Sequence, residues 1–247
     1  MTSHQSPAPL EAWPLTGPVI SHGLFVTGTD TGVGKTLVAA ALLRTLAGRG
    51  VRVVGMKPVA AGCATTAQGL RNEDAAALAA ASNVEAPIDL VNPYRFEPAI
   101  APHVAAAQAG VTISLARIRE AFRALSAMAQ WVVVEGAGGL LVPLNDHEDF
   151  GDLARLLQLP VVLVVGMRLG CLNHALLTAE AVQRRGLRFA GWVANRLDAA
   201  TPAFEQNVQT LRNRLDAPLL GIVPFGVKNA EAAASFLDLQ FLENRLH

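Results

Sequence analysis

Continuous apolar runs recur along the chain and alternate with segments whose composition and length suit helices. The runs predict strands at residues 24–26, 51–57, 131–135, 161–165, 189–195 and 219–223. The segments between them predict helices at residues 35–47, 72–81, 103–109, 115–128, 150–157, 202–215 and 230–246, and one that follows residues 170–173 and ends at 185. Strands that are apolar throughout, rather than at alternate positions, are typical of a parallel sheet covered on both faces. The pattern therefore predicts an α/β protein with a mostly parallel β-sheet flanked by helices on both faces.

Two internal stretches and the N-terminal end lack this pattern. Residues 60–69 predict a loop of small residues, and residues 85–102 hold four prolines and predict an irregular connection. Residues 1–20 are rich in proline but lack the basic start and apolar core of a signal peptide. No linker or internal repeat interrupts the remainder, so we expect one domain at residues 21–247 after a loosely ordered N-terminal extension.

The composition predicts a sizeable hydrophobic core and gives equal numbers of basic and acidic side chains. Hydrophobic residues make up 51% of the 247-residue chain and charged residues 16%, with 20 basic and 20 acidic side chains. No basic run appears, so we expect no nucleic-acid partner and no membrane partner. The longest apolar run, residues 159–167, contains Pro160 and is too short to span a membrane. Cys63 and Cys171 lie outside any metal-ligand spacing, as expected for reduced thiols in a cytoplasmic protein.

The chain is organised around a glycine-rich loop, GTDTGVGKT at residues 28–36, between the first strand and the first helix. Such a loop points backbone N–H groups at phosphate oxygens, and the helix start adds a partial positive charge. Lys35 is placed to reach the β- and γ-phosphates, and the Thr36 hydroxyl to ligate Mg²⁺. Five residues separate Gly28 from Gly34, one more than in the usual pattern. Strand, loop and helix nevertheless follow in the required order, and a nucleoside triphosphate site is predicted.

Three further polar side chains close predicted strands. Lys57, Glu135 and Asn195 each stand where an apolar run ends. Because the carboxyl ends of parallel strands meet at one edge of the sheet, we expect these side chains beside the glycine-rich loop. An ionised Glu135 after four apolar residues needs a partner, and we prefer Mg²⁺ to a lysine or arginine, since residues 136–139 leave room for a ligand.

Asp74 and Lys57 each have two interpretations. Asp74 lies in a first helical turn, where the helix dipole alone favours an acid. It becomes a metal candidate because Thr36 and Glu135 supply too few oxygens to hold Mg²⁺ firmly. Lys57 could pair with Glu135 or Asp74, or it could neutralise a transferring phosphoryl group, and we prefer the second.

These motifs together resemble those of the dethiobiotin synthetase family. The matching segments run in order from about residue 23 to residue 226 and comprise residues 27–36, 57–62, 71–74, 134–139, 169–174, 191–195 and 218–221, with Pro224. The five-residue spacing in the glycine-rich loop is also the family's own pattern. The combination of motifs is highly specific, whereas the loop alone is shared by many nucleotide-binding proteins.

The resemblance implies an ATP-dependent ring closure by a homodimer whose site lies at the subunit interface. In this family one amine of 7,8-diaminononanoate (7,8-diaminopelargonate) forms a carbamate with CO₂. The carbamate oxygen attacks the γ-phosphate of ATP and gives a carbamic-phosphoric anhydride. The second amine then attacks the carbonyl carbon, expels phosphate and closes the cyclic urea. We therefore expect ATP and Mg²⁺ as cofactors and the diamine and CO₂ as substrates.

The resemblance also implies a role for each matched residue. The catalytic residues would be Lys57, Lys35 and Thr31. The nucleotide would contact Asp30, Thr31, Gly32, Val33, Gly34, Lys35, Thr36, Asn195, Arg196, Pro224, Phe225 and Gly226. The diamine would contact Lys57, Ala61 and Arg168, with its carboxylate on the partner subunit's helix start at Gly170, Cys171, Leu172 and Asn173. Mg²⁺ would be held by Thr36, Asp74 and Glu135.

Four positions depart from the family pattern, among them Gly32, where some members carry a glutamate, and Ala101, where a serine is common. Ala61 stands where a serine is expected and Arg168 where a lysine is expected, which bears on substrate affinity.

Three other classes of protein share parts of this pattern. A regulatory or partitioning P-loop ATPase is the alternative function, but such proteins carry a signature lysine five positions before the loop lysine, and that position is Asp30 here. Cobyrinate amidating synthases need a glutamine-hydrolysing domain that this chain is too short to hold. A non-catalytic binding domain would not need to keep Lys57 and Glu135.

Overall fold

Strands and helices alternate through residues 22–240, which are the residues that the computed structural model describes. The strands are β1 (His22–Gly28), β2 (Val53–Met56), β3 (Val59–Ala60), β4 (Ala64–Thr66), β5 (Gly69–Arg71), β6 (Tyr94–Arg95), β7 (Trp131–Gly139), β8 (Val161–Met167), β9 (Phe189–Arg196) and β10 (Leu219–Val223). The helices are α1 (Lys35–Gly48), α2 (Glu73–Ala81), α3 (Ile88–Val91), α4 (Pro102–Gln108), α5 (Leu115–Met128), α6 (Phe150–Leu156), α7 (Cys171–Arg184), α8 (Phe204–Arg214) and α9 (Ala230–Ala234). The predicted N-terminal extension at residues 1–20 lies outside the described residues.

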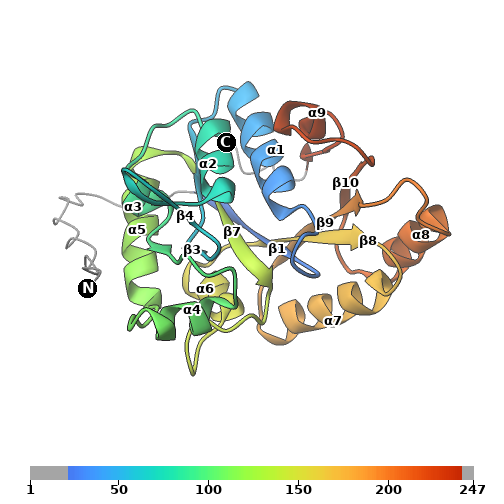
Figure 1. Cartoon of the computed structure of the whole chain (residues 1–247). Helices are drawn as coiled ribbons and strands as arrows, with labels where there is room; N and C mark the ends of the chain where they lie inside the picture. The colour runs from blue at the N-terminus through green and yellow to red at the C-terminus, as the bar shows by residue number, and fades with distance from the viewer. Residues whose placement is uncertain (1–21, 241–247) are drawn as a thin grey trace.

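A parallel sheet forms the centre of the described part of the chain (Figure 1). Its strand order is β10-β9-β8-β1-β7-β2, and every neighbouring pair is parallel. β1 lies between β7 and β8, so that Phe25 pairs with Val134 on one side and Val161 on the other. The α/β fold class predicted from the apolar runs is therefore confirmed.

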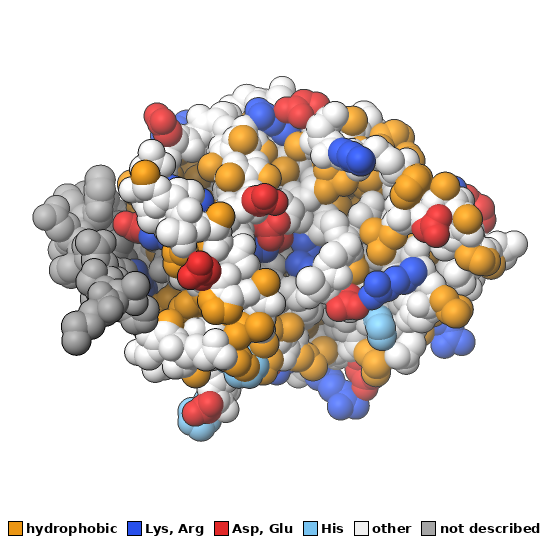
Figure 2. Space-filling model, viewed as in Figure 1, with side chains coloured by type: hydrophobic (Ala, Val, Ile, Leu, Met, Phe, Trp, Pro, Cys, Tyr) orange, Lys and Arg blue, Asp and Glu red, His pale blue; other side chains and the backbone are white. Residues whose placement is uncertain are grey.

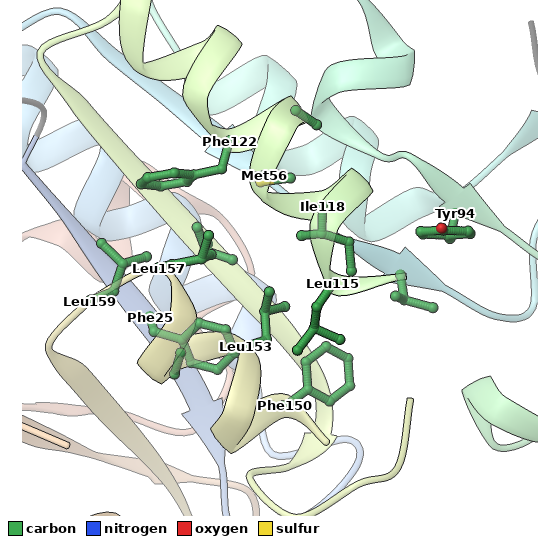
Figure 3. Close-up of a cluster of buried hydrophobic side chains, with 14 of the residues drawn as sticks. Phe25, Met56, Tyr94, Leu115, Ile118, Phe122, Phe150, Leu153, Leu157 and Leu159 are labelled. Atoms are coloured by element: carbon green, nitrogen blue, oxygen red, sulfur yellow. The ribbon is translucent and has the colours of Figure 1, made fainter. Parts of the chain in front are cut away.

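Helices cover the sheet on both faces because successive residues of a strand point to opposite sides. Leu24 and Val26 pack in the same cluster as the apolar residues of α1, α2 and α9. Phe25, between them in sequence, packs on the other face against α5 and α6 (Figure 3). Side chains of α7 and α8 cover β8 and β9. Among the described helices, none has both the length and the apolar character that a membrane span requires.

Three stretches differ from the sequence predictions. The predicted loop at residues 60–69 contains β4, which pairs with β5 in a small antiparallel hairpin. The predicted irregular connection at residues 85–102 contains α3 and β6, and β6 pairs with β3. The last helix ends at Ala234 rather than at residue 246, because Leu237 turns back to form a bridge with Gly221. Residues 241–246 of that predicted helix lie outside the described residues.

Candidate active site

The glycine-rich loop leaves β1 at its carboxyl end and enters α1. Gly34 precedes α1 with φ +90°, in the left-handed region that favours glycine, and a Cβ there would lie 2.2 Å from Asn195 Nδ2. No side chain of the described residues caps α1, whereas the Asn72 side chain accepts a hydrogen bond at the start of α2, as predicted. The first N–H groups of α1 are therefore left for an anionic ligand.

Asn195 supports this loop from the carboxyl end of β9. Its Nδ2 donates to the Val33 carbonyl at 2.9 Å, and both residues are buried. Arg196, the next residue, donates to the carbonyls of its own loop and lies 4.7 Å from the Phe204 ring centroid. Residues 224–226 follow β10, and half of the Phe225 surface is exposed. The predicted contacts of these residues with adenine stay predictions.

Lys57, Glu135, Asp74 and Thr36 come together beside the loop. The Lys57 ammonium lies 2.7 Å from Glu135 Oε1 and 2.8 Å from Asp74 Oδ2, and it also donates to the Gly136 carbonyl at 3.4 Å. Glu135 Oε1 accepts a second hydrogen bond, at 2.9 Å, from the Thr36 hydroxyl. Glu135 lies within β7 and not at its end, because the strand continues to residue 139. The predicted convergence at the sheet edge is thus seen for these four side chains.

Hydrogen bonds hold the Lys57 backbone, and the contacts with Glu135 and Asp74 hold its side chain. Its N–H donates to the Val91 carbonyl at 2.7 Å, and its carbonyl accepts from Asn92 Nδ2 at 2.6 Å. Only 3% of the Lys57 side chain and 1% of the Glu135 side chain are exposed, against 43% of Asp74. The ammonium is therefore a positioned charge and not a mobile surface group.

Burial and neighbouring charges act in opposite directions on the pKa values of Lys57, Asp74 and Glu135. Burial alone would lower the pKa of Lys57, but Glu135 and Asp74 raise it above its ordinary value. Burial also opposes ionisation of Asp74, yet the Lys57 ammonium lowers the pKa of that carboxyl. For Glu135, burial prevails and, with the nearby Asp74 carboxylate, raises its pKa. Lys57 is thus held as a cation between two carboxyl groups.

Lys35 is the second lysine of the site. Its ammonium donates to the Asp30 carbonyl at 2.8 Å, across the loop. Burial, and then repulsion from Lys57, lower the pKa of Lys35 to about 8. A triphosphate bound to this loop would stabilise the charged form of Lys35.

The residues predicted to hold Mg²⁺ fit a hard divalent cation. Glu135 Oε2 is buried and has no hydrogen-bond partner among the described residues. An orphaned carboxylate oxygen of this kind, next to the Thr36 hydroxyl and the half-exposed Asp74, is the donor set that Mg²⁺ takes with phosphates and water completing its shell. The site therefore has both the charge and the oxygen atoms for the metal.

The other predicted substrate residues lie along the same edge. Arg168, after β8, forms an ion pair with Asp30 of the glycine-rich loop, and both side chains are about half exposed. Gly170 precedes α7 with φ +91° and no side-chain cap from the described residues, so residues 170–173 begin a second free helix N-terminus. Ala61 follows β3, next to the buried Cys63. Thr31 is exposed at the tip of the loop. Figure 2 shows acidic and basic side chains gathered across the middle of this face.

Two contacts that support the loop were not predicted from sequence. The Arg168–Asp30 ion pair and the Asn195–Val33 hydrogen bond both join the loop to strands far along the chain. The only signal in the sequence was that each partner stands at a strand end. Which strand ends face the loop depends on strand order, which apolar runs do not encode.

Together, the fold and the loop define a P-loop nucleotide-binding protein. A family model described as an AAA domain matches residues 22–230. The structure is similar to the MinC:MinD cell division protein complex of Aquifex aeolicus, with a TM-score of 0.54, 18% identity and 87% and 86% of the two chains covered. It is also similar to the septum site-determining protein MinD complexed with Mg-ADP from Pyrococcus horikoshii, with a TM-score of 0.51, 15% identity and 87% of each chain covered. At these identities the likeness shows the fold alone.

Similarity to curated proteins identifies the family within the P-loop nucleotide-binding proteins. The chain is 55% identical to the ATP-dependent dethiobiotin synthetase BioD of Aromatoleum aromaticum over 213 residues, 85% of this chain and 95% of that protein. It is also 55% identical to the enzyme of the same name from Nitrosospira multiformis, over 221 residues, 89% of this chain and 96% of that protein. The chain therefore belongs to the dethiobiotin synthetase family, as the sequence motifs indicated. The family is one of ligases, so the alternative of a regulatory or partitioning ATPase is set aside.

Proposed function

We propose that this chain closes the ureido ring of dethiobiotin from 7,8-diaminononanoate, CO₂ and ATP. An amine of the diamine loses a proton and joins CO₂ as a carbamate. The carbamate oxygen takes the γ-phosphoryl group and ADP leaves. The second amine attacks the carbonyl carbon, loses a proton and expels inorganic phosphate. The observation that carries this proposal is the buried Lys57 ammonium, fixed beside the P-loop where a carbamate and a γ-phosphate would meet.

Each charged side chain of the cluster has a role in this reaction. Lys35 and the uncapped start of α1 would bind the triphosphate, and Lys57 would stabilise the negative charge that develops between carbamate and γ-phosphate. Thr36, Asp74 and Glu135 would hold Mg²⁺. When bound, the metal neutralises phosphate charge and orients the γ-phosphate. The Asn195 contact with Val33 keeps the loop backbone in place for binding.

Phosphate release that depends on both the diamine and bicarbonate tests this function. Wild-type protein with Mg-ATP should release phosphate and form dethiobiotin in equal amounts. Lys57→Met should lose the product, whereas Lys228→Met, which removes an exposed lysine, should retain it. Phosphate release at the same rate with and without the diamine would contradict the proposed reaction.

We also propose that two copies form the enzyme and that each supplies the start of α7 to its partner's site. Leu169 is 99% exposed and Leu177 is 56% exposed, an apolar surface at the beginning of α7 that a second copy could cover. The Cys171 N–H donates to the Arg168 carbonyl at 3.0 Å, which leaves the N–H groups of Leu172 and Asn173 for the substrate carboxylate.

Mixing two inactive variants separates this arrangement from a site built within one chain. Lys35→Ala should inactivate the P-loop of its own subunit, and Gly170→Asp should place a negative charge against the substrate carboxylate. Gly170→Asn, which keeps the shape without the charge, is the matched control. Random exchange gives half mixed dimers with one intact site each, so activity should recover to about a quarter of wild type. No recovery after subunit exchange would contradict a shared site.

We further propose that the chain works in the cytoplasm and that residues 21–247 form one domain. The continuous central sheet of the described residues supports a single domain, since both ends of the described chain pack on it. Limited proteolysis checks the domain prediction, because a second domain would release a stable internal fragment.

A further inference from the structure

The ammonium of Lys57 occupies the place of a cation among the oxygens proposed to hold Mg²⁺. Its partners are Glu135 Oε1 at 2.7 Å and Asp74 Oδ2 at 2.8 Å. The Thr36 hydroxyl donates to the same Glu135 oxygen. The Lys57 ammonium thus contacts two of the three proposed metal ligands, and the third, Thr36, is hydrogen-bonded to one of those two.

We propose that Lys57 is an internal stand-in for the metal, and that it leaves the two carboxylates when Mg²⁺ binds. This inference rests on the proposed function, since the metal enters the site with ATP. Without the metal, Lys57 keeps Asp74 and Glu135 close together. With the metal, the same carboxylates turn to the divalent ion and the ammonium is free for the carbamate and the γ-phosphate.

Charge and geometry both favour such an exchange. An ammonium bonds carboxylate oxygens at about 2.8 Å, whereas Mg²⁺ needs them at about 2.1 Å, so a metal that takes Glu135 Oε2, Asp74 and Thr36 draws these groups toward itself and away from the ammonium. Lys35, Lys57, Asp74 and Glu135 carry two positive and two negative charges. The charges of these four side chains therefore balance when no ligand is bound. When Mg²⁺ is added, four positive charges face the two carboxylates, and the surplus of two is met by the phosphates of the nucleotide.

This exchange would make the Lys57 charge available only when metal and nucleotide are present. An ammonium bound to two carboxylates has little charge to offer a substrate anion. Once released, it lies next to a triphosphate whose charge the metal only partly neutralises. The lysine would then stabilise the transferring phosphoryl group at the step where charge develops.

Binding of Mn²⁺ without nucleotide, followed by electron paramagnetic resonance, tests the exchange. Lys57→Met should bind Mn²⁺ about 10-fold or more tightly than wild type, because the competing ammonium is gone and two carboxylates are left without a counterion. Lys35→Met is the matched control, since Lys35 carries the same charge nearby but donates to the Asp30 carbonyl. It should change Mn²⁺ affinity by about 3-fold or less. Equal changes of Mn²⁺ affinity in the two variants would mean that each lysine only repels the metal through its charge, and would overturn the exchange.

Nuclear magnetic resonance of lysine side chains gives a second readout on the unaltered protein. The chain has three lysines, Lys35, Lys57 and Lys228, so ¹⁵N-lysine labelling yields a spectrum that single variants assign. Addition of Mg²⁺ and ADP should move the Lys57 Nζ signal and speed the exchange of its protons with water, whereas ADP in EDTA, which brings the nucleotide without the metal, should not. An unchanged Lys57 signal, with Mg²⁺ bound, would show lysine and metal side by side and would overturn the proposal. Both experiments omit the diamine, so their outcome is separate from whether dethiobiotin is formed.

Discussion

Removal of the Lys57 charge should destabilise the folded chain far more than removal of an exposed lysine. Lys57→Met leaves Glu135, which is 1% exposed, without its closest cation. Taking one partner from a buried pair costs about 3–5 kcal/mol, whereas an exposed substitution such as Lys228→Met should cost less than about 0.5 kcal/mol. For a chain of this size, the first change corresponds to a fall in Tm of about 6–20 °C.

The double-mutant cycle isolates the ion pair from the loss of packing. Glu135→Gln alone should cost less than Lys57→Met, about 2–3 kcal/mol, because Asp74 at 2.8 Å still compensates the ammonium. In the double variant both buried charges are gone, and the half-exposed Asp74 can be solvated. Its destabilisation should therefore fall short of the sum of the single variants by at least about 1 kcal/mol.

Urea unfolding in EDTA at pH 7.5, without nucleotide, measures the four proteins of the cycle and Lys228→Met on one scale. Additivity of the two substitutions within about 0.5 kcal/mol would refute an energetic ion pair between Lys57 and Glu135. So would a Lys57→Met protein as stable as Lys228→Met. Either result would mean that Lys57 is not paired in solution as the structure has it.

Four further predictions have defined outcomes. Lys35→Ala should lower turnover about 100-fold or more, and a near-normal rate of phosphate release would contradict its role on the triphosphate. Because the pKa of Lys35 is about 8, most of this side chain is neutral at pH 9, so metal-free ATP binding should be accompanied by proton uptake there. Calorimetry in buffers of different ionisation enthalpy checks this, and no uptake at pH 9 would refute it. Asn195→Ala loses one hydrogen bond to Val33 and should weaken ATP binding about 2- to 12-fold, measured as Kd; no change would return Asn195 to a purely structural role. Arg168→Gln should raise KM for the diamine with little effect on Tm, since its ion pair with Asp30 is exposed, and an unchanged KM would remove Arg168 from the substrate site.

The fold was predictable where burial alone defines an element. β10 and α5 lie at the predicted residues: β10 is apolar apart from Gly221, with Leu220 and Val223 buried, and the buried apolar positions of α5 recur from Leu115 to Leu125. The hairpin of β4 and β5 was missed because its residues are mostly exposed, so no apolar pattern marks them. The end of α9 was missed because Leu237 pairs with a strand residue, which local sequence does not reveal.

Prediction of the site followed the same division. Lys57 and Glu135 could be found because each polar residue follows or ends a buried apolar run, and the ends of parallel strands share an edge. Their direct ion pair was weighed as the less preferred alternative, and the structure shows it. Asn195 was assigned to the base of the nucleotide, whereas its observed contact is with the loop at Val33. That contact depends on β9 lying two strands from β1, a matter of strand order rather than of local pattern.

The central position of β1 has a consequence for the synthesis of the protein. β1 leaves the ribosome before any other strand of the central sheet, yet its neighbours are β7, from residue 131, and β8, ending at residue 167. Until those segments have been translated, both edges of β1 remain unpaired and the P-loop has no sheet to hold it. Open edges of this kind invite pairing with other nascent chains. The nucleotide-binding loop, which emerges first, can therefore take its place in the sheet only after β8, which ends at residue 167, has been translated.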